Sequence, residues 1–181
     1  MLSFARICLI SREEALKLVE SSTKRDHSIA VSGIMKELAR KLGEDVEEWE
    51  IVGLLHDLDY DLTRADRGRH GITAAEILEG KLPEEALYTI KAHDHRTGLP
   101  PRSLLDRSLT ATDALAVFID DQGITCVEKG EALAARFNDE SVGKPWISNA
   151  ILTFCRERGF KLIELLELGL SPEPRAHTRR E

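Results

Sequence analysis

The sequence predicts an all-α fold, built as a single helical domain over residues 11–170. Leu, Ala, Glu and Arg are frequent while aromatic residues make up 5% of the chain, and this balance favours helices over a sheet. Apolar residues recur at intervals of three and four in most segments, which is the period of an amphipathic helix. The 181 residues suffice for one well-buried domain, whereas two would be cramped.

Capping signals delimit the first three predicted helices. A capping-box pattern, SREE, begins at Ser11 and precedes a short first helix. A second helix is expected over residues 24–42, and Gly43 follows it as a suitable C-cap. Asp45 is a candidate N-cap for a third helix, whose apolar run ends at residue 57. The arginine-rich polar stretch that follows is expected to be a loop.

Glycine and proline residues separate the remaining predicted helices. A helix over residues 72–78 is ended by Gly80, and Pro83 fits the first turn of the next helix. After a further Gly-Pro break, a longer helix is expected over residues 102–120. Three more amphipathic segments cover residues 126–137, 146–158 and 160–168. We interpret these as packing helices that could also serve as a lid or a dimer surface. Residues 171–181 have no apolar period and are expected to form a disordered tail.

The charge balance and the cysteines limit the classes of function. A formal net charge of −7 argues against a general binder of nucleic acid or of anionic membranes, because either needs a basic surface. It leaves room for a small anionic substrate, since metal ions can supply local positive charge. Cys8, Cys126 and Cys155 are widely spaced and form no CxxC motif, which predicts a reducing, cytoplasmic location.

The apolar segments are too short to cross a membrane. No run approaches the ~18–20 apolar residues of a membrane span. Residues 1–10, MLSFARICLI, have no preceding cationic region and no clear cleavage site after them, so a signal peptide is not expected. This stretch fits either a docking segment or an extension upstream of the true start.

Histidine and aspartate residues recur on the inner faces or at the ends of different predicted helices. His27 shares the apolar face of its helix, and Asp113 lies within the apolar run TATDALAVFI. Each alone could be a hydrogen-bonded core residue, but Asp is rarely fully buried unless it is paired. The candidate metal ligands are His27, His56, Asp57, His70, His93 and Asp113. Imidazole and carboxylate ligands without thiolate suit Fe, Mn, Zn, Co or Mg. His95 is interpreted as a bystander or as a residue that supports a ligand.

The order H…HD…D on successive helices resembles the HD superfamily of metal-dependent phosphohydrolases. The four defining positions of that family match His27, His56, Asp57 and Asp113, and the resemblance covers about residues 11–120. The resemblance implies an HD-domain helical bundle with additional C-terminal helices. It also implies one or two divalent metal ions and hydrolysis of a phosphoester by a metal-bound hydroxide.

The chain is also similar to the small HDIG-type branch of this superfamily, and within it to the symmetrical dinucleoside-tetraphosphate hydrolases. Members of that branch have extra histidines between the HD pair and the last Asp. His70 in RHG and His93 in IKAHD match those positions. By this resemblance, Asp57 would bridge the first ion to a second ion held by His70 and His93.

Other positions depart from the patterns of related branches. The HD pair is followed by residues 58–61, LDYD, where many members have Ile-Gly or a Lys a few residues on. The GYP signature of the cyclic-di-GMP branch and the ED pair of guanosine-tetraphosphate hydrolases are absent. Asp94 stands where some two-metal members have a second His. These departures leave the number of ions and the substrate open, and they argue against a cyclic-dinucleotide role.

Two functions fit this pattern. The leading hypothesis is a phosphohydrolase that acts on a nucleotide or other small phosphoester, without an extended nucleic acid or a membrane as partner. Asp57 would lie at the reaction centre, with an exposed Asp59 or Asp61 as the proton acceptor. The residues expected to contact phosphate are Arg64, Arg67, Lys91 and Arg96, although the arginines near residue 64 also fit a solvated surface. The alternative is a non-catalytic sensor or binding module on an HD fold. A homodimer is left open.

Overall fold

The computed structural model describes residues 10–126, 128–129, 132 and 144–170, and every regular element among them is a helix. The α-helices are α1 (Arg12–Val19), α2 (Arg25–Leu42), α3 (Val46–Leu55), α4 (Ile72–Ile77), α5 (Glu84–Ala92), α6 (Leu104–Asp121), α8 (Pro145–Arg158) and α9 (Leu162–Leu170). Two short 3₁₀ helices, η1 (Arg67–Arg69) and η2 (His95–Thr97), lie in the connections. The predicted all-α fold is therefore confirmed for the described residues.

Local sequence signals set where the helices begin and end. Ser11 accepts a hydrogen bond from the Glu14 backbone, and the Glu14 carboxylate accepts one from the Ser11 backbone, which completes the predicted capping box. Asp45 accepts hydrogen bonds from two backbone N–H groups at the start of α3. Helices α2, α4, α6, α8 and α9 begin and end within two residues of the predicted bounds.

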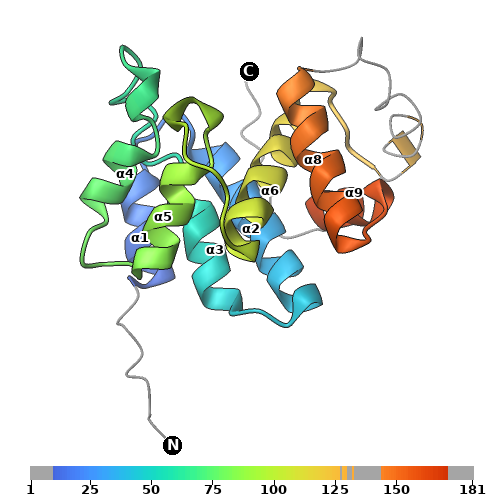
Figure 1. Cartoon of the computed structure of the whole chain (residues 1–181), viewed down its shortest axis with the longest axis horizontal. Helices are drawn as coiled ribbons and strands as arrows, with labels where there is room; N and C mark the ends of the chain where they lie inside the picture. Colours follow the sequence, from blue (N-terminus) through green and yellow to red (C-terminus); the bar gives the residue numbers. More distant parts are fainter. Residues whose placement is uncertain (1–9, 127, 130–131, 133–143, 171–181) are drawn as a thin grey trace, which may run out of the picture.

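Helices α2, α3 and α6 form the middle of the bundle. Helix α2 packs against α3, α6 and α9, while α6 also contacts α5 and α8. Figure 1 shows α1, α4 and α5 on one side of this middle group and α8 and α9 on the other. Gly53 allows α3 to lie close to α2, because a Cβ atom there would be 2.9 Å from the Cα of Ser32. Helix α2, which carries His27, and helix α3, which ends at His56, are therefore held close together.

Three expectations concern residues that the structure does not describe. The predicted helix over residues 126–137, the segment 1–10 and the tail 171–181 lie wholly or largely outside the described ranges. Among the described helices, none combines the length and the apolar character needed to cross a membrane.

Candidate metal centre

The predicted ligands come from five different places in the bundle and meet at one point. His27 lies in the first turn of α2, and Asp113 lies in the middle of α6. His56 is the C-cap of α3 and His93 is the C-cap of α5, so both follow directly on buried apolar turns. His70 lies between η1 and α4. Most residues of the cluster therefore lie at the ends of helices, where their side chains can point into the interior.

The carboxylate of Asp57 lies at the centre of the cluster. Its oxygens lie 2.9 Å from Nε2 of His70, 3.6 Å from Nε2 of His56, 3.7 Å from Nε2 of His93 and 3.8 Å from Nε2 of His27. On the opposite side, Oδ1 of Asp113 lies 2.9 Å from Nε2 of His27 and 3.7 Å from Nε2 of His56. All six residues that the sequence singled out as ligands are therefore brought together.

The outer nitrogens of three imidazoles are held by hydrogen bonds. Nδ1 of His56 lies 2.8 Å from the carbonyl of Gly53, and Nδ1 of His93 lies 2.6 Å from the carbonyl of Ile90. Because a carbonyl can only accept, each of these Nδ1 atoms carries the proton, and the Nε2 lone pair faces the cluster. Ligands in metal sites are commonly oriented in this way.

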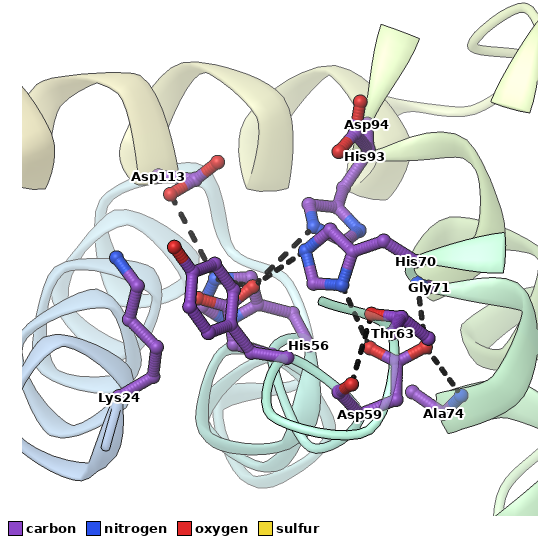
Figure 2. Close-up of polar contacts among 12 residues, drawn as sticks. Lys24, His56, Asp59, Thr63, His70, Gly71, Ala74, His93, Asp94 and Asp113 are labelled. Carbon is purple, nitrogen blue, oxygen red and sulfur yellow. Dashed lines mark hydrogen bonds and ion pairs between the residues drawn. The ribbon is translucent and has the colours of Figure 1, made fainter. Parts of the chain in front are cut away.

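Asp59 holds the third imidazole, that of His70, through its outer nitrogen. Its Oδ1 lies 2.8 Å from Nδ1 of His70, and its Oδ2 accepts hydrogen bonds from the backbone N–H groups of Gly71 and Ala74. Figure 2 shows Asp59 on the side of His70 away from Asp113. Asp59 is fully buried, so the expectation of an exposed proton acceptor is wrong for this residue. Both carboxylate oxygens of Asp59 are already used, one by the imidazole of His70 and the other by the backbone at the start of α4.

Asp61 also points away from the cluster. Its carboxylate accepts hydrogen bonds from the backbone N–H and the hydroxyl of Thr23, and it pairs with Arg64 at 2.7 Å. These contacts hold the pKa of Asp61 below its ordinary value. The carboxylate therefore joins the turn after the HD pair to the segment before α2.

The electrostatics of the cluster keep its carboxylates ionised. Burial alone would raise the pKa of Asp57, but the neighbouring imidazoles of His56, His70 and His93 outweigh it and hold that pKa well below the ordinary value. The pKa of Asp113 is likewise lowered, because His27 and His56 outweigh the effect of burial. Burial would lower the pKa of His70, but Asp57 and Asp59 raise it to about 9. The two carboxylates on either side of His70 thus favour positive charge at this point of the cluster.

The donor set fits a divalent metal ion. Three overlapping groups have ligand atoms within 4.8 Å of one another: His27, His56 and Asp57; His56, His93 and Asp113; and Asp57, His70 and His93. Nε2 of His56 is fully buried and has no hydrogen-bond partner among the described residues. A buried lone pair without a partner is costly unless a ligand uses it. Because the groups share members, the cluster offers room for one ion or for a bridged pair.

A cavity of about 770 Å³ opens from the cluster toward α8. Asp57, His70, His93 and Asp113 contribute to its wall, together with Arg96, whose contact with a substrate the sequence predicted. Arg64, Arg67 and Lys91 are not among the described residues that line it. Arg67 instead lies over the ring of Tyr60, 4.1 Å from the centroid.

Sequence reasoning missed further residues of this cavity. Lys24 and Tyr60 line it, and each lies three positions from a predicted ligand in a helix or turn, so their spacing was a usable signal. Lys144 and Trp146, at the start of α8, also line it. No local pattern could have found these two, because α8 is brought to the site by packing against distant parts of the chain, mainly α6.

Comparisons with known proteins match this chain to one family. The model of the HD domain matches residues 25–117. The chain is 34% identical over 92 residues to Ribonuclease Y of Desulfotalea psychrophila and 33% identical over 106 residues to Ribonuclease Y of Protochlamydia amoebophila. These matches cover 50% and 58% of this chain but only 17% and 20% of the relatives. No solved structure was found to match. The relatives thus support the HD domain, and not the narrower similarity to dinucleoside-tetraphosphate hydrolases.

Proposed function

Because the chain belongs to the HD-domain family, we propose that it is a metal-dependent phosphohydrolase acting on a nucleotide or other small phosphoester. The observation that carries this proposal is the Asp57 carboxylate, which faces four imidazoles within 3.8 Å. A divalent ion bound there would lower the pKa of bound water and offset the charge on a phosphoryl group. The cytoplasmic location, the homodimer and the identity of the metal stay predictions.

The chain's own residues take distinct roles in this proposal. His27, His56 and Asp113 would hold one ion, and His70 and His93 a second, with Asp57 shared between them. Asp59 is a positioning residue, since it fixes the tautomer of His70 from behind. Arg96 lines the cavity and is tied to Asp94, so its guanidinium is held at the rim where a phosphate would enter.

A second candidate substrate is RNA, and the similarity to Ribonuclease Y favours it. That name denotes cleavage of phosphodiesters in RNA, which uses the same attack on phosphorus as hydrolysis of a small ester. The net charge of −7 opposes it, because an extended polyanion gains affinity from a basic surface. The matched region also covers at most 20% of the two relatives named above, so the activity of a whole Ribonuclease Y comes to this chain only as a proposal.

A phosphoester screen tests the proposal. Purified protein would be assayed with Mn, Co, Ni, Mg and Zn against nucleoside phosphates, other small phosphoesters and short single-stranded RNA. We expect turnover of small esters that Asp57→Ala abolishes together with metal retention, while circular dichroism shows unchanged helicity. Asp61→Asn is the matched control, because its carboxylate lies away from the cluster.

The outcomes of the screen separate the alternatives. Turnover of RNA alone would replace the small substrate with a nucleic acid. Full activity in the Asp57→Ala variant would show that the proposed site is wrong. An absence of turnover with every metal, together with tight binding of a nucleotide or protein, would support the non-catalytic binding module.

A further inference from the structure

The cavity beside the cluster is also lined by residues of η2 and α8. Its wall includes Asp57 and His93 of the cluster as well as Lys144 and Trp146. Apolar side chains such as Leu99, Pro101 and Val117 are also part of the lining. A volume of about 770 Å³ lies within the range of sites for small organic ligands, roughly 300–1,000 Å³. It therefore has room for more than a phosphate group.

Two aromatic rings of this lining, from η2 and α8, lie close to each other. The imidazole of His95 and the indole of Trp146 have centroids 6.5 Å apart and planes inclined by 28°. This separation is near the outer limit for a directly contacting aromatic pair, about 4.5–7 Å. The two rings therefore pack on each other only loosely.

Both rings are open to solvent although they line the same cavity as the buried cluster. The His95 side chain is 72% exposed, and Trp146 is 38% exposed. Nδ1 of His95 lies 3.6 Å from the buried carboxylate of Asp94, which pairs with Arg96. His95 and Arg96 thus lie beside the same carboxylate.

Cationic side chains also line the cavity. They include Arg96 and Lys24, with Nζ of Lys24 4.7 Å from the centroid of the Tyr60 ring. Lys144 at the start of α8 lines it too, and its Nζ is 3.5 Å from the carboxylate of Asp121. A ligand that joins an anion to a flat apolar ring would match this combination of charge and aromatic surface.

We propose that His95 and Trp146 form a binding subsite for the nucleobase of a nucleoside phosphate whose phosphate group lies at the Asp57 cluster. The proposal rests on the proposed function and deepens it, because it selects nucleotides from among small phosphoesters. The flat ring of a base stacks on aromatic and histidine side chains with little dependence on base identity. The subsite therefore favours a nucleotide over a sugar phosphate, and it does not choose strongly between bases.

Binding measurements with paired analogues test the subsite without depending on turnover. The probes are the phosphonate analogues of adenosine 5′-monophosphate and ribose 5-phosphate, in which a CH₂ group replaces the ester oxygen. Titration calorimetry on the metal-loaded full chain should give about ten-fold tighter binding of the adenosine analogue, the scale of one base–aromatic stack. Trp146→Ala should remove this preference and leave the affinity for the ribose analogue unchanged, while Trp146→Phe should retain most of it. His95→Ala should act in the same direction.

Tryptophan fluorescence gives an independent readout, since the chain has two tryptophans and Trp49 is 3% exposed in the core. The adenosine analogue should quench the emission of a Trp49→Phe variant and leave that of Trp146→Phe unchanged. Equal affinity of the wild-type protein for both analogues would overturn the subsite, as would a Trp146→Ala variant that weakens both equally. Neither result would bear on the proposed phosphohydrolase activity, which the phosphoester screen tests separately.

Discussion

Nδ1 of His70 lies 2.8 Å from Oδ1 of Asp59, and this contact links a ring of the cluster to a carboxylate that the sequence placed in the solvent. The other oxygen of Asp59 accepts hydrogen bonds from Gly71 and Ala74 at the start of α4. The backbone of α4 thereby fixes Asp59, and Asp59 fixes the ring. The Nε2 atom of His70 is left pointing at Asp57, 2.9 Å away.

Asp59→Asn should weaken metal binding without removing a ligand. The side-chain amide of asparagine accepts hydrogen bonds only through its oxygen. It therefore cannot replace both carboxylate oxygens that bind His70 and the backbone of Gly71 and Ala74, and the imidazole loses its fixed orientation. We expect metal affinity to fall ~10–100-fold, the usual effect of losing such a supporting residue. Competition with a fluorescent chelator would measure it. Asp61→Asn is the matched control and should bind metal like the wild-type protein, whereas an unchanged affinity in Asp59→Asn would refute the positioning role.

Gly71→Ala should damage both stability and the cluster. Gly71 has φ +79°, and a Cβ atom there would lie 2.5 Å from the carbonyl oxygen of Ile90 and 3.2 Å from the ring of His93. Backbone strain and overpacking together should lower the free energy of unfolding by about 2–4 kcal/mol. Metal affinity should also fall, because the added methyl group displaces His93.

Gly80→Ala provides the matched comparison for this prediction. Gly80 has φ +74°, but a Cβ atom there meets nothing within 4 Å. This variant should therefore show backbone strain alone, about 1–2 kcal/mol, with unchanged metal affinity. Urea denaturation measures both variants. Equal losses of stability would show that the contact with Ile90 and His93 is not significant.

The metal content of the purified protein should show how many ions the cluster binds. We expect about two equivalents of Fe, Mn or Zn per chain by mass spectrometry of protein purified without a His-tag or added metal. A double variant, His70→Ala and His93→Ala, should retain about one. A single equivalent in the wild-type protein would reduce the site to His27, His56, Asp57 and Asp113, and would return the other two histidines to supporting roles.

Chelation should lower the melting temperature of the wild-type protein. An ion at 100 times its dissociation constant adds ~2.7 kcal/mol to the free energy of unfolding. For a chain of this size that corresponds to a shift of about 5–10 °C in thermal melts. The Asp57→Ala variant should show no such shift, and a wild-type protein insensitive to chelators would contradict the proposed centre.

Asp106 should make the stability of the bundle sensitive to acid. Burial would raise its pKa, but hydrogen bonds from Thr89, Arg102 and Ser103 outweigh it and lower that pKa below 3.8. A lowered pKa in the folded state gives stability that is present above the unfolded-state pKa and is lost as pH falls through the folded-state value. Asp106→Asn should thus cost about 1–3 kcal/mol at pH 7, with the difference from wild type shrinking below about pH 4. Denaturant titrations across pH measure it, and a constant difference would rule out the carboxylate as its cause.

The sequence by itself determined most of the described helices and which histidine and aspartate residues would gather as candidate ligands. Capping at Ser11 and Asp45 and the apolar periods gave helix bounds that the structure repeats, because these signals act within one turn of the chain. His27, the HD pair and Asp113 could be chosen because polar ligands on apolar faces are unusual. The histidines at positions 70 and 93 could be added because the pattern continued at the ends of the next helices.

Only the tertiary structure decided what surrounds that ligand set. Asp59 followed the HD pair in a polar stretch and was expected in solvent, but α4 folds over it and supplies two backbone donors. Trp146 lies 53 positions after His93 in the sequence, yet α8 packs on α6 and brings it to the same cavity. Local sequence patterns encode spacing along a helix, whereas burial and cavity walls depend on contacts between helices far apart in the chain.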